Sequence, residues 1–204
     1  MISGQLTGSG LKFIIDYPRQ DDNGLVEGRV LLFLSQNDEK EPRLQISDNS
    51  TTGFVFGVDA IGKQAPAGVT VDNEIFGYPV PSLDDIPAGE YWVQGLIHKY
   101  ETFDLKTGHR VKLPMDRGEG QHWHSAPGNY YSTPKKVTLD PKKRKTVQIT
   151  LDQVIPAIDE PEDTKYVKHI KIQSKLLTEF WGRPMYLGAH VLLPEGYDEH
   201  PDSR

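Results

Sequence analysis

The stretch KKVTLDPKKRKTVQITLD, residues Lys135–Asp152, alternates apolar and polar side chains on both sides of a short basic segment. Alternation with a period of two is typical of a half-buried β-strand, which turns one face to a core and the other to water. Between the two runs, Pro141–Lys145 combines a proline with four cationic residues, so we predict a hairpin turn whose charges keep its tip solvated. Two such strands indicate an antiparallel β protein.

Outward from this stretch, segments rich in β-branched and aromatic residues alternate with clusters of turn-forming residues. The expected strands are Leu11–Tyr17, Gly28–Ser35, Gly53–Ala60 and Gly89–Phe103. With 19 Gly and 15 Pro separating short strands, the sequence predicts an all-β fold, and an immunoglobulin-like antiparallel β-sandwich is the simplest architecture for it. We expect only one short helical turn, within residues 71–87, and no longer helix.

The composition changes at Asp152. Residues 152–165, DQVIPAIDEPEDTK, hold five acidic residues and two prolines, a composition typical of an extended, weakly packed linker. Strand signals resume in YVKHIKIQSKLL and GRPMYLGAHVLLP. The predicted organisation is therefore a β-sandwich domain over residues 1–151, an acidic linker over residues 152–166 and a β-hairpin over residues 167–204.

Composition excludes several classes of function. The 204 residues carry 23 basic and 29 acidic side chains, and this net charge of −6 argues against a nucleic-acid partner or an anionic membrane surface. The absence of cysteine excludes disulfides, thiol catalysis and thiolate metal sites. We expect no membrane span, since no apolar run approaches about 18 residues. The first residues lack the features of a signal peptide, so the compartment stays open.

The last segment of the chain resembles a known family. Residues Trp181–Arg204 contain a V-x-LP-x-GY turn made by Val191, Leu193, Pro194, Gly196 and Tyr197. This segment resembles the opening strands of the esterase branch of the α/β-hydrolases, the enterochelin-esterase and esterase-D-like group. Residues 76–103 and 120–134 are similar to the region that precedes the hydrolase domain in large bacterial esterase-like proteins.

The resemblance implies a non-catalytic role for this chain. An α/β-hydrolase needs a nucleophile elbow, G-x-S-x-G, which this sequence lacks. We therefore expect an accessory region of an ester hydrolase, truncated before the catalytic domain that would be its main partner, with no catalytic residue of its own. The family also suggests a periplasmic or secreted location. Apolar residues expected to be exposed on the hairpin, Leu187, Val191 and Leu193, suggest a homodimer formed through an unpaired strand edge.

The histidine-rich stretch GEGQHWHSAPGNYY, residues Gly118–Tyr131, offers a candidate metal site. On a strand, His122 and His124 would point the same way, and both could reach one divalent metal ion. A third ligand is required, for which the available residues are Asp116, Glu119, His98 and His109. The cupin pattern, in which a glutamate follows H-x-H after three or four residues, is not met, because SAPGNYY follows His124. No other cofactor is expected.

Two further interpretations of this stretch stay open. Its glycines and proline favour a looped connection that plugs the end of the sandwich, with imidazoles bonded to backbone carbonyls. Alternatively, exposed aromatic rings could stack on a carbohydrate or an ester ligand, as in a carbohydrate-binding module. The candidate ligand-binding residues are Trp92, Trp123, Tyr130 and Tyr131. Outside the stretch, His190 is expected on the solvent side of its strand, opposite Val191 and Leu193.

Overall fold

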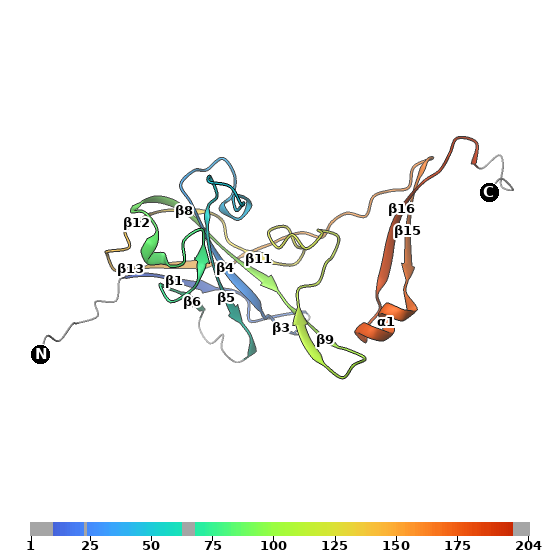
Figure 1. The fold of residues 1–204 in the computed structure, drawn as a ribbon, viewed down its shortest axis with the longest axis horizontal. Coiled ribbons are helices and arrows are strands. Elements are labelled where there is room, and N and C mark those ends of the chain that lie inside the picture. The colour runs from blue at the N-terminus through green and yellow to red at the C-terminus, as the bar shows by residue number, and fades with distance from the viewer. Residues whose placement is uncertain (1–9, 23, 63–67, 198–204) are drawn as a thin grey trace, which may run out of the picture. The chain divides into compact units, whose positions relative to one another are not determined.

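The computed structural model describes residues 10–22, 24–62 and 68–197, and its secondary structure is mostly β, with 43% strand and 8% helix. The predicted all-β class is therefore confirmed. The chain divides into two compact units (Figure 1). The N-terminal unit comprises residues up to Tyr100 together with Pro114–Ala157, and the C-terminal unit comprises Glu101–Leu113 and the residues from Ile158 onward. These units are defined by contacts in space, so the sequence-based boundaries at 151 and 166 stay predictions.

The larger sheet of the N-terminal unit has seven strands in the order β14-β11-β8-β4-β5-β7, with β12 also paired to β8. All its pairings are antiparallel. Its strands are β4 (Gly28–Ser35), β5 (Phe54–Ala60), β7 (Gly77–Tyr78), β8 (Gly89–Lys99), β11 (Tyr130–Tyr131), β12 (Lys135–Leu139) and β14 (Gln153–Val154). The long central pair β4–β8, in which Val30 lies opposite Ile97, forms the middle of this sheet.

The smaller sheet has three strands, β13 (Lys145–Thr150), β1 (Leu11–Asp16) and β6 (Val69–Val71), in that order. β1 runs antiparallel to β6 and parallel to β13. A separate short ribbon pairs β2 (Gln20–Asp21) with β3 (Gly24–Leu25). The parallel pair was not expected, since the sequence predicts an antiparallel arrangement throughout.

The two sheets share one hydrophobic core. Phe13 and Ile15 from the smaller sheet pack in the same cluster as Leu32 and Tyr91 from the larger one, and all four side chains are fully buried. Alternate residues of each strand therefore face this core, as the period-two pattern predicts. One face of the seven-stranded sheet packs against this core. The candidate site lies on the other, outer face of the sheet.

The basic segment Pro141–Lys145 forms a turn, but the predicted hairpin is wrong. Asp140 initiates the turn by accepting hydrogen bonds from the Lys142 and Lys143 amides. The flanking strands do not pair with each other: β12 pairs with β8 in the larger sheet, and β13 pairs with β1 in the smaller one. Each of the two strands has one apolar face. That face can line the shared core whether the two strands belong to the same sheet or to opposite sheets.

Between the strands of the N-terminal unit, the described residues include the 3₁₀ turns η1 and η3. η1 covers Pro42–Leu44, and η3 covers Leu83–Asp85, with the Ser82 hydroxyl accepting a hydrogen bond from the Asp84 amide. The single helical turn expected within residues 71–87 is thus confirmed as η3. After β14, the buried Ile155 belongs to the N-terminal unit, whereas residues 156–165 are exposed and have no regular secondary structure.

The C-terminal unit contains two antiparallel ribbons and one helix. β9 (Glu101–Asp104) pairs with β10 (Arg110–Leu113), and β15 (Val167–Gln173) pairs with β16 (Tyr186–Leu192) (Figure 1). α1 (Lys175–Trp181) connects β15 to β16, so the expectation of no helix beyond one turn is wrong here. Ser174 caps the start of α1 by accepting a hydrogen bond from the Leu177 amide. The last residues of the predicted hairpin, 198–204, lie outside the described part of the chain.

The β9–β10 ribbon packs against α1. The rings of Phe103 and Trp181 meet edge to face, with centroids 5.2 Å apart. The guanidinium of Arg183 lies over the Phe103 ring and pairs with Glu101. The Lys106 amide donates to the Phe180 carbonyl at 2.9 Å, at the C-terminal end of the helix. No helix in the described part of the chain is long and apolar enough to cross a membrane.

The β15–β16 hairpin has two chemically different faces. Residues directly opposite each other share a face, so Ile170, Ile172 and Leu187 lie together with Ala189 and Val191. The other face carries His169, His190, Lys171, Gln173 and Tyr186, together with Val167 and Leu192. We call these the apolar face and the polar face of the hairpin.

Candidate functional site

The histidine-rich stretch lies on the outer face of the seven-stranded sheet. There, Leu31 and Phe33 from β4 and Leu96 from β8 form a second hydrophobic cluster, separate from the shared core. Trp123 covers this cluster, with its ring stacked on Phe33 at a centroid distance of 5.2 Å and an interplanar angle of 5°. The stretch is therefore anchored to the sheet by an aromatic stack.

Arg43, which belongs to η1, fastens the loop at His124. Its Nη1 donates to the His124 carbonyl, and its guanidinium carbon lies 4.6 Å from the centre of the Tyr131 ring. Its Nε donates to Glu41 Oε2 at 2.8 Å. A second fastening is the Asn129 side chain, which donates to the Trp123 carbonyl at 2.9 Å. Backbone carbonyls of the loop are thus satisfied by side chains, where no strand partner is present.

A buried glutamine joins these parts together. Gln94 on β8 is fully buried; its Oε1 accepts from the Arg43 amide at 3.0 Å, and its Nε2 donates to Glu41 Oε2 at 2.7 Å and to the Ser132 carbonyl at 2.8 Å. Partial burial acts to raise the pKa of Glu41, but the hydrogen bonds from Arg43 and Gln94 outweigh it and lower that pKa. Glu41 therefore stays ionised at neutral pH and pairs with Arg43.

The candidate ligands His122 and His124 do not lie on a strand. The backbone from Gly118 to Asn129 forms successive turns, with positive φ angles of 67° at Gly120 and 65° at Gln121. The expected shared strand face is thus wrong, although the two imidazole centroids are only 5.5 Å apart. His122 is exposed and His124 is half-buried. Burial lowers the pKa of His124, and the charges of His122 and Arg43 lower it further.

The candidate carboxylate ligands bond to backbone amides of the loop. Asp116 Oδ1 accepts from the Gly118 amide at 2.8 Å, and Glu119 Oε2 accepts from the Arg117 amide at 2.7 Å. Among the residues that the structure describes, no three histidine or acidic side chains form a group that could hold a metal ion. The metal site therefore stays a prediction.

Glu119 interacts with His98 instead. Its side chain is only 8% exposed, and Oε1 is buried without a hydrogen-bond partner in the described part of the chain. Burial lowers the pKa of His98, and the negative charge of Glu119 opposes this shift in part. The charge of Glu119 therefore acts on an imidazole at the Tyr100 end of β8, where the His98 and Tyr100 rings lie 6.5 Å apart.

Three of the four candidate ligand-binding rings already use one face within the protein. Trp123 stacks on Phe33, Tyr131 lies under Arg43, and Tyr130 lies 5.1 Å from the ammonium of Lys99 and packs against the shared core. Trp92 is half-buried on the outer face. At least one face of each of these three rings is therefore already in contact with the protein and cannot stack on a planar ligand. The predicted role of the rings in binding stays open.

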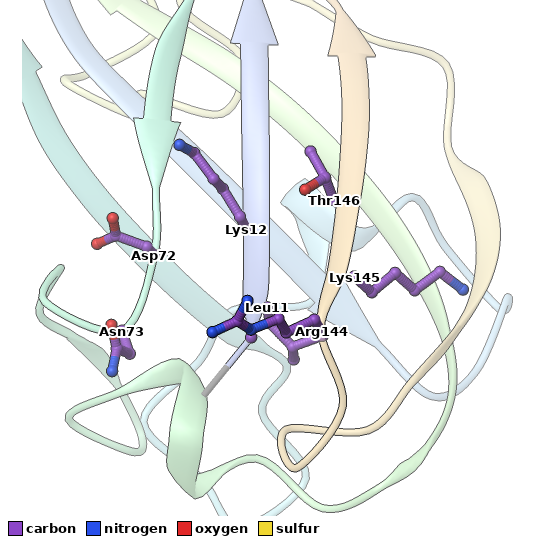
Figure 2. Close-up of a pocket in the computed structure, with 8 residues that line it drawn as sticks. Leu11, Lys12, Asp72, Asn73, Arg144, Lys145 and Thr146 are labelled. Atoms are coloured by element: carbon purple, nitrogen blue, oxygen red, sulfur yellow. The ribbon is translucent and has the colours of Figure 1, made fainter. Parts of the chain in front are cut away.

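A pocket of ≈ 370 Å³ lies elsewhere, at one end of the smaller sheet. Lys12 and Asp72 contribute opposite charges to its wall, and Arg144 lies beside Leu11 (Figure 2). The Lys145 ammonium is bonded to the Thr138 carbonyl. The charges are mixed and the pocket borders Gly10, the first described residue. None of the predicted site residues lines it.

Sequence reasoning missed the residues that hold the loop. Arg43 and Gln94 belong to segments distant from the stretch in sequence, and nothing in the pattern of either segment indicates the contact. It also missed His169, which lies opposite His190 in the hairpin. Each strand of the hairpin carries one histidine, so knowing which residues of β15 and β16 lie opposite each other would have been enough to predict the pair.

Comparison with known protein families, with curated proteins and with solved structures finds no match for this chain.

Proposed function

We propose that the chain is a non-catalytic accessory region of an ester hydrolase, in which an immunoglobulin-like β-sandwich precedes the opening strands of an α/β-hydrolase sheet. The observation that carries the proposal is the apolar face of the β15–β16 hairpin. Ile170, Ile172 and Leu187 are 40, 59 and 55% exposed there. A two-stranded ribbon with an open hydrophobic face is marginally stable in water and gains stability from a covering layer or further strands.

Tyr91 supports the proposal that the N-terminal unit is an immunoglobulin-like sandwich. This fully buried residue lies near the start of β8, shortly after η3, and its hydroxyl donates to the Pro87 carbonyl at 2.7 Å. A tyrosine that bonds back to the backbone a few residues upstream, at the corner before a central strand, is a feature of immunoglobulin-like sandwiches. Burial raises the pKa of Tyr91, so the hydroxyl keeps the proton that it donates.

In this proposal the N-terminal unit positions or shields the hydrolase domain, or lends contacts to its ester substrate. The loop over the outer face is suited to such a role, since Arg43 and Asn129 hold its irregular backbone in place while His122 remains exposed. A second copy of the chain, bound through the hairpin, is the other occupant that the apolar face could accept. A periplasmic or secreted location remains part of the proposal.

The test combines catalysis with surface chemistry on the purified, tag-free chain. We expect no hydrolysis of 4-nitrophenyl acetate or butyrate above the buffer rate. We also expect a hydrophobic dye to bind the wild type, and the variant Ile172→Lys/Leu187→Lys on the apolar face to abolish that binding. The matched control, Val167→Lys/Gln173→Lys, adds the same charge to the polar face and should retain dye binding.

Enzymatic ester turnover by this chain alone would overturn the proposal. So would a wild type that binds no dye and stays a monomer at all concentrations, because the apolar face would then need no cover. Sedimentation velocity separates the two occupants: concentration-dependent association that is lost in Ile172→Lys/Leu187→Lys indicates a second copy, and dye binding by a strict monomer supports a separate hydrolase domain.

A further inference from the structure

The polar face of the β15–β16 hairpin brings two histidines together. His169 and His190 lie directly opposite each other in the strand register. Their Nδ1 atoms are 2.5 Å apart, and their rings lie at 83° with centroids separated by 4.6 Å. His190 is exposed and His169 is half-buried. Two imidazole nitrogens thus point at the same spot on the surface of the protein.

Coordination geometry fits this arrangement after a small adjustment. Metal–imidazole bonds of about 2.0–2.1 Å place two nitrogen ligands about 3.3 Å apart in a tetrahedral site. The two Nδ1 atoms would therefore separate by about 0.8 Å, a movement that rotation about the χ angles of the exposed His190 can supply. The backbone need not move, because opposite residues in an antiparallel pair already hold their Cβ atoms within about 5.5 Å.

The charged side chains around the pair form two ion pairs. Asp163 lies beside His169, with its Oδ1 accepting a hydrogen bond from the His169 backbone amide at 2.8 Å. Lys171, the nearest cation on the same face, is paired with Glu160 at 2.7 Å. Lys168 lies on the apolar face and its ammonium is 3.6 Å from Asp163 Oδ2. The carboxylate of Asp163 is thus held at the backbone of His169 and paired with Lys168, and Lys171 on the polar face is balanced by Glu160.

We propose that His169 and His190 form a two-ligand binding site for a divalent transition-metal ion. Neutral imidazoles select copper, zinc or nickel, and the oxygen-seeking ions calcium and magnesium are not expected to bind. Two protein nitrogens leave further coordination positions open to water or to a ligand. The site lies on the polar face of the hairpin and does not depend on what covers the apolar face, so it stands independently of the proposed function.

The experiment titrates the tag-free full chain with Cu²⁺ and Zn²⁺. Isothermal titration should show one ion per chain, and the electron paramagnetic resonance spectrum of the copper form should show coupling to imidazole nitrogen. His169→Ala and His190→Ala should each weaken binding by more than about 100-fold, since losing a ligand costs more than the roughly 10- to 100-fold of a supporting contact. Asp163→Asn keeps the acceptor for the His169 amide and removes the charge; it should weaken binding less than either histidine variant does.

Two control variants distinguish metal binding at His169 and His190 from metal binding at other histidines. His109→Ala removes an exposed histidine of the same unit, and the affinity should not change. His122→Ala/His124→Ala removes the pair in the loop of the N-terminal unit and should also leave the affinity unchanged. The proposal is overturned if the wild type binds no stoichiometric metal, or if affinity survives in His169→Ala and His190→Ala while it is lost in the loop variant. Circular dichroism confirms that each variant is folded.

Discussion

At the scale of single residues, the buried hydroxyl of Tyr91 makes the clearest prediction. Tyr91→Phe removes its hydrogen bond to Pro87 and leaves that carbonyl without its partner. Losing a typical intramolecular hydrogen bond costs about 0.5–1.5 kcal/mol, so the free energy of unfolding should fall by that amount in urea titrations. The control is Tyr100→Phe, whose hydroxyl bonds Asp59 at an exposed position and whose loss should cost less than about 0.5 kcal/mol. Equal losses of unfolding free energy in the two variants would contradict the proposed role of Tyr91 at the corner before β8.

His98 should make the stability of the N-terminal unit depend on pH. Burial lowers its pKa in the folded state, so below about pH 6.5 the unfolded chain binds a proton that the folded chain does not. The free energy of unfolding should therefore decrease as the pH falls from 6.5 towards the lowered pKa. We expect His98→Gln to show a smaller decrease than the wild type when urea midpoints are compared at pH 8, 6 and 5. An unchanged pH dependence would contradict this.

The carboxylate of Glu119 should hold the pKa of His98 higher than burial alone would. Glu119→Gln removes the negative charge and preserves a side-chain oxygen for the Arg117 amide. Without the charge, the pKa of His98 should fall further, and an NMR titration of the imidazole resonances measures the shift directly. Asp116→Asn, which changes an exposed carboxylate of the same loop, provides the control. An upward shift in Glu119→Gln would mean that the two groups do not interact in this way.

At the scale of secondary-structure elements, Gly182 couples the end of α1 to the β9–β10 ribbon. Its φ is +67°, and a Cβ at this position would lie 2.6 Å from the Asp104 carbonyl oxygen. Gly182→Ala therefore combines left-handed strain of about 1–2 kcal/mol with a displaced ribbon. Hydrogen exchange should accelerate in β9, β10 and α1. Gly188→Ala, where no heavy atom lies within 4 Å, should leave exchange in those elements unchanged. Similar hydrogen exchange in both variants would show that the β9–β10 ribbon does not depend on the close approach between Gly182 and the Asp104 carbonyl.

Local pattern predicted the strands well, because burial on one face leaves a trace in the sequence. β12 and β13 begin where the alternating pattern begins, and β4 coincides with the apolar segment Gly28–Ser35. The same pattern does not reveal the partner of a strand, so the turn at Pro141–Lys145 was assigned to a hairpin although it joins two sheets. α1 was missed because it is only seven residues long and buries none of them, which leaves no apolar stripe at a period of 3.6.

The candidate site shows the same limit. The residue types in the stretch from Gly118 to Tyr131 suggested both a loop and a metal site, and the turns at Gly120 and Gln121 decide the backbone geometry. The partners that hold the loop, Arg43 and Gln94, come from distant segments and depend on the tertiary fold. For His169 and His190, a one-residue change in register would have placed the two imidazoles on opposite faces of the hairpin.

At the scale of the whole molecule, the hydrophobic core is divided very unequally. Of the buried hydrophobic residues in the described part of the chain, only Phe103 belongs to the C-terminal unit. That unit is also discontinuous in sequence, because residues 101–113 join those from 158 onward. The sequence did not predict this association, since the strand expected over Gly89–Phe103 runs across the boundary between Tyr100 and Glu101. The two units should therefore differ in stability, and unfolding should not be two-state.

The three tryptophans allow this difference to be measured. Trp92 and Trp123 belong to the N-terminal unit, and Trp181 in α1 belongs to the C-terminal unit, where its ring contacts Phe103. In a urea titration followed by tryptophan fluorescence, we expect two transitions, with the C-terminal unit unfolding first because it buries little apolar surface. Trp181→Phe should abolish the first transition and preserve the second, whereas Trp92→Phe should reduce only the second. A single transition in the wild type that both variants report at the same midpoint would mean that the two units unfold cooperatively as one.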